Sequence, residues 1–534
     1  MTPSVSPAPA DEGLRRHGIG DLVSRSAARH PDKIALVFGS TRYTYRALEQ
    51  TINRAANALS ARGIRRGERV ALFSRNNDAY VILYFALARL GALSVPINFM
   101  LNASEVAYIL GHCSARGLIV QECLHATAQA ALQQLAEPPT LCGLLRESAH
   151  PLPAGWQEAR DWLEYPLQLP PHDPVPEEEP IQIMYTSGTE SRPKGAVLSS
   201  RNLLAQYASC IIDGEMSGTD IELHALPLYH CAQLHAFLCP GLYLGATNIL
   251  LPGADPACML ERIEAERVTK LFCPPTVWIA LLRHADFARR DLSCLRKAYY
   301  GASVMPTPIV RELQERLPGL RLFNVYGQTE MSPLATVLKP EDQLRKLGSA
   351  GRPVVHVETR VVDEDDRPVP PGIPGEIVHR GPQVMLGYWN DPQKTASAFR
   401  NGWFHSGDLG VFDEEGYLQV LDRKKDMIKS GGENVASREV EEVLYQHPAV
   451  AEAAVIGMPD ARWIEAVTAA VVLRPGAQTT GSALIGFCRE RLAGFKTPKR
   501  IVILERLPKN ASGKILKREL RSQLAPADSC TRAP

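Results

Sequence analysis

The chain has 534 residues, which is too long for one hydrophobic core, and its 45% hydrophobic content is enough to fill two or more domains. Its 59 basic and 58 acidic side chains alternate in sign without long blocks, so no overall field favours nucleic acid or an anionic membrane. An anionic ligand must therefore be bound by a local group of cations and hydrogen-bond donors.

The N-terminal stretch MTPSVSPAPADEGLRR is polar and rich in proline, and it lacks the apolar centre of a signal peptide. We expect residues 1–19 to form a flexible tail. The eleven cysteines are mostly far apart, which favours reduced thiols in a cytoplasmic protein. The longest apolar region, residues 79–97, is interrupted by Arg89 and Pro96, so it predicts a buried helix followed by a strand rather than a membrane span.

Residues 20–421 alternate helical and strand-like segments. For example, YRALEQTINRAANALSARG has apolar residues at helical spacing, and RVALFSRN is a short apolar run that ends in polar residues. This alternation predicts an α/β domain in which largely parallel sheets are flanked by helices. The Pro/Glu-rich stretch PPHDPVPEEEP, residues 170–180, is typical of a surface connector.

A loop rich in donors follows, with the sequence YTSGTESRPKG over residues 185–195. Hydroxyls, glycine N–H groups and a lysine in one short loop after a strand favour a polyphosphate site. The loop does not match the Walker A pattern G-x-x-x-x-G-K-[ST], and a plain surface loop is the alternative interpretation.

Two further stretches favour a nucleotide site. NVYGQTE, residues 324–330, places a tyrosine ring, a glycine turn and a carboxylate together, as expected where a base stacks and Mg²⁺ is held by oxygen ligands. In WFHSGDLG, Asp408 follows a glycine turn, where a carboxylate can accept hydrogen bonds from a ribose diol.

A second domain begins near VLDRKKDMIKSGGENV. The segments EVEEVLYQH, VAEAAVIGM, EAVTAAVVL and GSALIGFCRERL then predict a small α+β domain, residues 422–525, which is large enough to be compact. We place a hinge at Asp422 and a second flexible tail at residues 526–534. Near the end of this domain, LPKNASGKILKREL puts Lys514 in a Ser-Gly loop, from which a lysine can swing in and out of a site.

In this order, these stretches resemble the adenylate-forming superfamily of acyl-CoA synthetases, nonribosomal adenylation domains and luciferases. The matching motifs are TSGT-x-x-x-PKG, YGQTE, SGDLG, DRKKDMIKSGGENV and PKNASGK, and the resemblance covers residues 20–525. It implies a large N-terminal domain of β-sheets flanked by helices, a small C-terminal lid, and an AMP-forming acid–thiol ligase that uses ATP, Mg²⁺ and CoA. A carboxylate would attack the α-phosphate of MgATP to give acyl-AMP and pyrophosphate, and the CoA thiol would then displace AMP.

The resemblance also implies residue roles. The β- and γ-phosphates would be held by Thr186, Ser187, Gly188, Thr189 and Lys194. Adenine would be framed by Gly301, Ala302, Asn324, Tyr326 and Gly327, and the ribose hydroxyls would be bound by Asp408 and Arg423. Glu330 would bind Mg²⁺, Thr329 would lie at the α-phosphate, and Lys514 would bridge the substrate carboxylate and the α-phosphate. Rotation about Asp422 would bring the CoA-binding stretch Lys429, Ser430, Gly431 and Gly432 to the site.

In LPLYHCAQLHAF, His230 matches the family position that gates the acyl pocket, and a histidine buried in the core is the alternative. The candidate pocket walls are Tyr229, Leu234, His235, Trp278 and Tyr299. This stretch has no carboxylate for the ammonium group of an amino acid, and we expect no carrier domain after the lid. We therefore expect a stand-alone synthetase for a fatty or other bulky hydrophobic acid, in preference to an aryl acid.

Glu190 departs from the family, which usually has a hydroxyl residue there and a glycine at the position of Ser191. We expect Glu190 to turn outward and pair with Arg192. In the alternative, its charge weakens adenylation and the protein acts mainly in thioester formation. Delivery of the acyl group to a carrier protein and a non-catalytic nucleotide-binding protein are further alternatives, and the sequence leaves a homodimer open.

Overall fold

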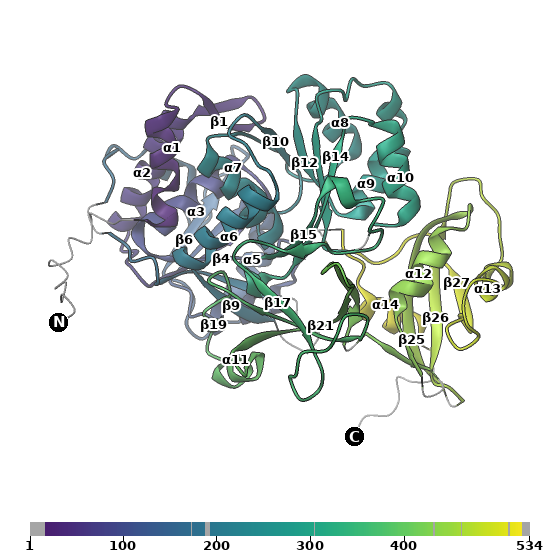
Figure 1. The fold of residues 1–534 in the computed structure, drawn as a ribbon. Coiled ribbons are helices and arrows are strands. Elements are labelled where there is room, and N and C mark those ends of the chain that lie inside the picture. The colour runs from purple at the N-terminus through teal and green to yellow at the C-terminus, as the bar shows by residue number, and fades with distance from the viewer. Residues whose placement is uncertain are drawn as a thin grey trace, which may run out of the picture.

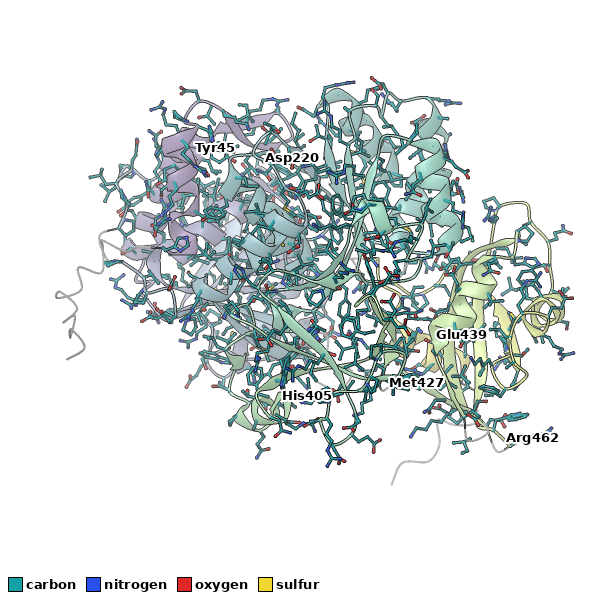
Figure 2. The ribbon with its side chains drawn as sticks, viewed as in Figure 1. Tyr45, Asp220, His405, Met427, Glu439 and Arg462 are labelled. Carbon is teal, nitrogen blue, oxygen red and sulfur yellow. The ribbon has the colours of Figure 1, made fainter. Side chains whose placement is uncertain are left out.

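In a computed structural model, the chain is described over residues 17–171, 174–186, 193–303, 305–424, 426–430, 433–460, 462–510 and 513–525. Within these residues the strands form four sheets. Three sheets and their helices make a large domain, and the fourth lies in a small domain at the C-terminal end (Figure 1). Figure 2 places Tyr45 and Asp220 in the large domain and Glu439 in the small one.

The first sheet has nine strands. Their order is β16 (Arg352–Pro353), β15 (Leu334–Leu338), β14 (Arg321–Gly327), β13 (Lys297–Gly301), β12 (Lys270–Phe272), β10 (Ile221–His224), β11 (Thr247–Leu250), β1 (Ile34–Phe38) and β2 (Thr41–Thr44). The strands from β14 through β1 pair in parallel, and antiparallel pairs close both edges. The carboxyl ends of β12, β13 and β14 therefore meet along one edge of the sheet, where ligands of α/β folds bind.

The second sheet has eight strands. Their order is β19 (Gly387–Tyr388), β9 (Lys194–Ser199), β8 (Pro180–Thr186), β4 (Leu93–Pro96), β3 (Arg69–Phe73), β5 (Gly117–Gln121), β6 (Leu141–Leu145) and β7 (Gln157–Glu158). The third sheet contains β17 (Glu358–Val362), β18 (Gly375–Arg380), β21 (Trp403–Phe412), β20 (Phe399–Arg400) and β22 (Leu418–Arg423).

Helices of the large domain cover these sheets (Figure 1). They are α1 (Leu22–Arg29), α2 (Tyr45–Ala61), α3 (Asp78–Leu90), α4 (Ala103–His112), α5 (His125–Leu132), α6 (Ser200–Asp213), α7 (Cys239–Leu244), α8 (Pro256–Ala265), α9 (Pro275–Arg283), α10 (Thr307–Arg316) and α11 (Pro392–Ala398). A short π-helix, Ala232–Leu238, precedes α7. The main apolar core joins α2 and α3 to residues of the first two sheets, and a second core lies under α8, α9 and α10.

The apolar region at residues 79–97 forms a buried helix and then a strand, as predicted. The helix α3 begins after Asn77, whose side chain accepts a hydrogen bond from the Tyr80 N–H, and it ends at Gly91 in the left-handed conformation. The buried Arg89 donates to the Glu49 carboxylate at 2.9 Å, so its charge is paired. Among the described residues, no helix combines the length and the apolar character that crossing a membrane requires.

The small domain contains the fourth sheet and three helices of the described chain. Its strands are β24 (Glu433–Val435), β23 (Ile428–Ser430), β26 (Ile464–Leu473), β25 (Val450–Asp460) and β27 (Arg500–Ile503), with helices α12 (Ser437–Tyr445), α13 (Gly481–Arg489) and α14 (Lys517–Leu524). Two apolar clusters pack on this sheet. The predicted hinge residue Asp422 lies near the end of β22, before the small sheet begins at Ile428.

The small domain contacts the large one on the side of α9 and α10. The Thr276 hydroxyl donates to the carbonyl oxygen of Gly513 at 3.0 Å, and the Thr307 N–H donates to the Glu442 carboxylate at 3.2 Å. In this arrangement, the loop that carries Lys514 lies against the large domain.

Candidate active site

The predicted phosphate loop connects two paired strands. Thr186 ends β8 and lies opposite Lys194, which begins β9. Residues 187–192, which include Ser187, Gly188 and Thr189, fall outside the described residues. The Lys194 ammonium lies 5.4 Å from the centre of the Tyr388 ring, which is within the range of a cation–π contact.

Tyr388 joins this cation to the predicted magnesium ligand. Its hydroxyl donates to the Glu330 carboxylate at 2.9 Å. Burial raises the pKa of Glu330, because the ionised form loses its hydration. A cation nearby would restore the stability of that ionised form.

The donor set at Glu330 fits Mg²⁺. Within the described residues, no cluster of three or more His, Cys, Asp or Glu side chains is able to hold a metal ion. Mg²⁺ is usually held by one or two carboxylates together with substrate phosphates, so a single carboxylate beside a phosphate loop is the expected arrangement. Glu330 would hold the ion, which would supply positive charge at the phosphates.

Thr329 lies beside the residue that follows His230. Both Thr329 and Glu330 belong to a short 3₁₀ helix directly after β14. The Thr329 hydroxyl lies 3.1 Å from Sγ of Cys231. The YGQTE motif and the His230 stretch, about a hundred residues apart in sequence, therefore meet at one place.

The predicted adenine residues lie at the ends of two parallel strands. Gly301 ends β13 and Ala302 follows it, and Asn324, Tyr326 and Gly327 belong to β14. A Cβ atom on Gly301 would lie 2.3 Å from the Val325 carbonyl oxygen, so only glycine allows this close approach of the strands. The Asn324 amide donates to the Ser349 carbonyl oxygen at 2.7 Å, which fixes its direction.

The predicted ribose residues form a connected group. The Tyr326 hydroxyl donates to Oδ2 of Asp408 at 2.8 Å, and Nε of Arg423 lies 3.6 Å from Oδ1. Asp408 and Arg423 are opposite one another on β21 and β22. These contacts orient the Asp408 carboxylate next to Tyr326, one of the predicted adenine residues.

Lys514 lies on a tight loop close to His230. Its N–H donates to the Asn510 side chain at 2.8 Å, and its carbonyl oxygen accepts from the Asn510 N–H at 2.9 Å. Burial, together with repulsion from the Lys514 cation, lowers the pKa of His230 to about 4. His230 is therefore a neutral hydrogen-bonding group at pH 7.

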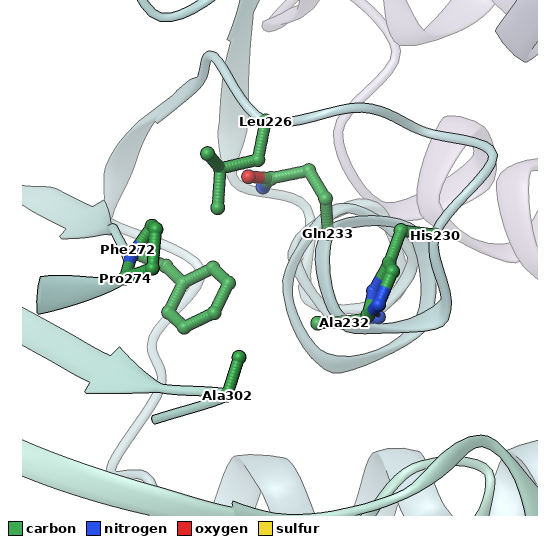
Figure 3. Close-up of a pocket in the computed structure, with 7 residues that line it drawn as sticks. All are labelled: Leu226, His230, Ala232, Gln233, Phe272, Pro274 and Ala302. Carbon is green, nitrogen blue, oxygen red and sulfur yellow. Dashed lines mark hydrogen bonds between the residues drawn. The ribbon is translucent and has the colours of Figure 1, made fainter. Parts of the chain in front are cut away.

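A small cavity opens beside His230 (Figure 3). It is lined by Leu226, His230, Ala232, Gln233, Phe272, Pro274 and Ala302. Apart from His230 and Gln233, its walls are apolar. Ala302, one of the predicted adenine residues, also lines the cavity, so the cavity adjoins the predicted nucleotide site.

Four of the five predicted acyl-pocket walls lie in the core rather than at this cavity. Leu234, His235, Trp278 and Tyr299 are buried, and three of them satisfy their polar atoms within the protein. His235 contacts Tyr207 and Gln182, the Trp278 indole donates to the Tyr299 carbonyl oxygen, and the Tyr299 hydroxyl donates to Gly214. Tyr229 packs edge-on against Phe99.

Local helix geometry accounts for two of these residues, Leu234 and His235. Residues 232–238 form a π-helix, in which an additional residue per turn rotates the following side chains relative to an α-helix. Leu234 and His235 consequently face the core, and Gln233 lines the cavity. A glutamine inside the apolar run CAQLHAFL was the signal that sequence reasoning missed.

The predicted CoA stretch is described only in part. Lys429 and Ser430 belong to β23, while Gly431 and Gly432 fall outside the described residues. The Lys429 side chain is exposed, its backbone N–H donates to Glu465 at 2.7 Å, and Ser430 is buried. These contacts are all within the small domain.

Comparison with known proteins defines the family. The AMP-binding enzyme profile matches residues 23–389, and the AMP-binding enzyme C-terminal domain matches residues 439–514. The chain is similar to a feruloyl-CoA synthase from Amycolatopsis sp (40% identical, covering 95% of this chain and 99% of that protein). It is 37% identical to an indoleacetate–CoA ligase from Aromatoleum aromaticum (strain DSM 19018 / LMG 30748 / EbN1), over 95% and 98% of the two chains.

The fold comparison agrees. A crystal structure of an anthranilate CoA ligase in complex with anthranoyl-AMP aligns with a TM-score of 0.88 and 28% identity, covering 96% of this chain and 99% of that chain. The chain therefore belongs to the AMP-binding enzyme family. It is an AMP-forming acid–thiol ligase that uses ATP, Mg²⁺ and CoA, which confirms the predicted family, fold, enzyme class and cofactors.

Proposed function

We propose that this enzyme converts a carboxylic acid bearing an aromatic ring into its CoA thioester. The cavity beside His230 carries this proposal, because its apolar walls include Phe272, against which a ring can pack. The names of the two relatives, feruloyl-CoA synthase and indoleacetate–CoA ligase, support the same class. This proposal departs from our sequence-based preference for a fatty or other bulky hydrophobic acid.

The polar residues around the cavity suit the acid end of such a substrate. The described lining residues include no carboxylate, so an amino acid's ammonium group would be desolvated without a partner. His230 is neutral and stands next to Lys514, whose cation would attract the substrate carboxylate. The acid would therefore enter with its carboxylate toward Lys514 and its ring toward Phe272.

For the first half-reaction, we propose that Lys514 neutralises the substrate carboxylate and the α-phosphate as they approach. Thr186, Ser187, Gly188, Thr189 and Lys194 would hold the other phosphates, with Glu330 and Thr329 nearby. The contact between Thr276 and Gly513 supports this role, because it holds the Lys514 loop against the large domain. Positioned charge of this kind lowers the barrier to an attack by one anion on another.

For the second half-reaction, we propose that the small domain rotates about Asp422. Rotation would withdraw Lys514 and bring Lys429, Ser430, Gly431 and Gly432 to the site. The interdomain hydrogen bonds support this rotation. Each of the two described above uses one side chain, so little free energy is lost when it breaks. Delivery to a carrier protein and an enzyme with weakened adenylation remain the alternative proposals.

The test is pyrophosphate release across matched aromatic and alkyl acids, with thioester formation measured in the same reactions. We expect cinnamic and arylacetic acids to be used with higher kcat/KM than alkanoic acids of equal carbon number. A clear preference for the alkanoic acids would contradict the proposal. Turnover with a phosphopantetheinylated carrier but not with CoA would favour the carrier alternative.

A further inference from the structure

Gln233 lines the cavity beside His230 and carries a buried carbonyl oxygen that has no partner among the described residues. The side chain is fully buried and lines the cavity, and Oε1 has no hydrogen-bond partner in the described part of the chain. Figure 3 shows Gln233 extending from its helix toward Leu226. A buried acceptor without a partner destabilises a protein, so one kept at a ligand cavity indicates a ligand that donates to it.

Polar contacts behind the cavity fix the direction of the Gln233 amide. Nδ2 of Asn248 donates to the carbonyl oxygens of Ala35 and Ala246, each at 3.1 Å. The Asn248 Oδ1 must therefore face Nε2 of His224, which lies 3.0 Å away. Since that oxygen can only accept, His224 carries a proton on Nε2.

His224 passes this orientation on to Gln233. Burial, with a contribution from the Lys270 cation, lowers the pKa of His224 to about 3, so its ring is neutral. With the proton on Nε2, the Nδ1 atom has a free lone pair and accepts from Nε2 of Gln233 at 2.6 Å. The amide nitrogen is thus committed to His224, and the amide oxygen is left without a partner among the described residues.

We propose that Gln233 selects acids that carry a hydrogen-bond donor, such as a phenolic hydroxyl or a ring N–H, on the part of the ring remote from the carboxylate. Gln233 is then a specificity-determining residue, while His224 and Asn248 act as positioning residues. This inference rests on the proposed aromatic substrate. A ring without a donor leaves Oε1 unpaired, and sites with buried polar groups discriminate strongly against such analogues.

The test compares kcat/KM for 4-hydroxycinnamic acid and cinnamic acid, measured by pyrophosphate release. One neutral hydrogen bond and the penalty for leaving it unmade predict a preference of about ten- to a hundredfold for the hydroxylated acid. Gln233→Met keeps the size of the side chain but removes the acceptor. We expect it to bring the ratio to within about threefold of one, mainly through loss of activity on the hydroxylated acid.

Two further variants separate recognition from packing. Leu226→Met alters the same cavity without a polar atom and should keep the wild-type ratio. His224→Phe touches no substrate but releases the Gln233 amide, so it should lower the ratio as well. Thermal unfolding of each variant shows whether it is folded. If a variant does not fold, the kcat/KM ratio of the wild-type enzyme for the two acids still tests whether the hydroxylated acid is preferred.

The outcomes distinguish this inference from the proposed function. A wild-type ratio near one, or an unchanged ratio in folded Gln233→Met, overturns the role of Gln233 but leaves an aromatic substrate intact. If only alkanoic acids are activated, the proposed substrate class is wrong, and the comparison moves to an ω-hydroxyalkanoic acid and its parent acid. A ratio near one for that pair also overturns the role of Gln233.

Discussion

The hydroxyl of Tyr326 donates to Oδ2 of Asp408 at 2.8 Å, which joins the end of β14 to β21. The two residues come from separate motifs 82 positions apart in sequence. This hydrogen bond holds the carboxylate proposed to bind the ribose against the ring proposed to frame the adenine. The nucleotide site therefore depends on the contact between the first and third sheets.

Tyr326→Phe should weaken ATP binding without abolishing catalysis. Removing one hydrogen bond costs about 1 kcal/mol, which corresponds to about a fivefold rise in KM for ATP. We expect kcat to change by less than about twofold. Tyr300→Phe is the matched control, because Tyr300 lies on the neighbouring strand β13 and its hydroxyl donates to Gln343 at 2.9 Å rather than to Asp408. Equal effects of both variants on KM would contradict the assignment.

Lys514→Ala should lower adenylation by about a hundredfold or more, because removal of a preorganised charge at the reacting groups has effects of this size. Thioester formation from a supplied acyl-AMP should be nearly unchanged. Lys509→Ala is the control, since Lys509 pairs with Glu452 at 2.7 Å within the small domain. Single-turnover assays of each half-reaction check this, and equal loss in both would contradict the role of Lys514.

Asp422→Pro should impair CoA transfer more than adenylation, because proline restricts the backbone at the proposed hinge. The Asp422 carboxylate also accepts from the N–H and hydroxyl of Ser437 at 2.8 and 2.6 Å. Asp422→Ala therefore serves as the control, since it loses these hydrogen bonds but keeps the backbone freedom. If the alanine and proline variants show the same ratio of the two half-reaction rates, the hinge lies elsewhere.

Glu190→Thr combined with Ser191→Gly should change the apparent affinity for ATP by less than about threefold. A carboxylate held about 4 Å from a phosphate charge would cost about 1 kcal/mol in water and about 4 kcal/mol at an effective dielectric constant of 20. We predict that Glu190 avoids this by pairing with Arg192, a prediction that falls outside the described residues. A gain of about a hundredfold in adenylation would show that Glu190 restrains the first half-reaction.

His230→Phe should reduce the decrease in the free energy of unfolding at acidic pH. The pKa of His230 is near 4 in the folded protein and about 6.5 in an unfolded chain, so the unfolded state binds the proton first as pH falls. The stabilising contribution is therefore complete above pH 6.5 and is lost as the pH falls toward 4. We expect the free energy of unfolding, measured with urea between pH 7 and 4.5, to depend less steeply on pH in the variant than in the wild type, because unfolding of the variant takes up as much as one proton fewer. An unchanged pH dependence would contradict the assignment.

Local patterns in the sequence were enough to predict some features. The run at residues 79–97 carries its own helix and strand signals, including the break at Gly91 that ends α3. The apolar run at residues 181–184 predicted a strand before the phosphate loop, and it belongs to β8. In both cases, short-range sequence determines the structure.

Other features depend on contacts that sequence spacing does not reveal. The π-helix at residues 232–238 changes which side chains face the cavity, and the α-helical period does not predict it. The orientation of Gln233 depends on Asn248 and on the carbonyl oxygen of Ala35, more than two hundred residues away from Asn248. This contact can be recognised only once the pairing of β11 with β1 is known.

The most direct test of the central claim measures pyrophosphate, AMP and acyl-CoA in one reaction that contains MgATP, CoA and 4-hydroxycinnamic acid. We predict that the three products form in equal amounts, that all three require the acid, and that pyrophosphate still appears in a single turnover without CoA. ATP binding with no acid-dependent pyrophosphate for any aromatic or alkyl acid would contradict the account.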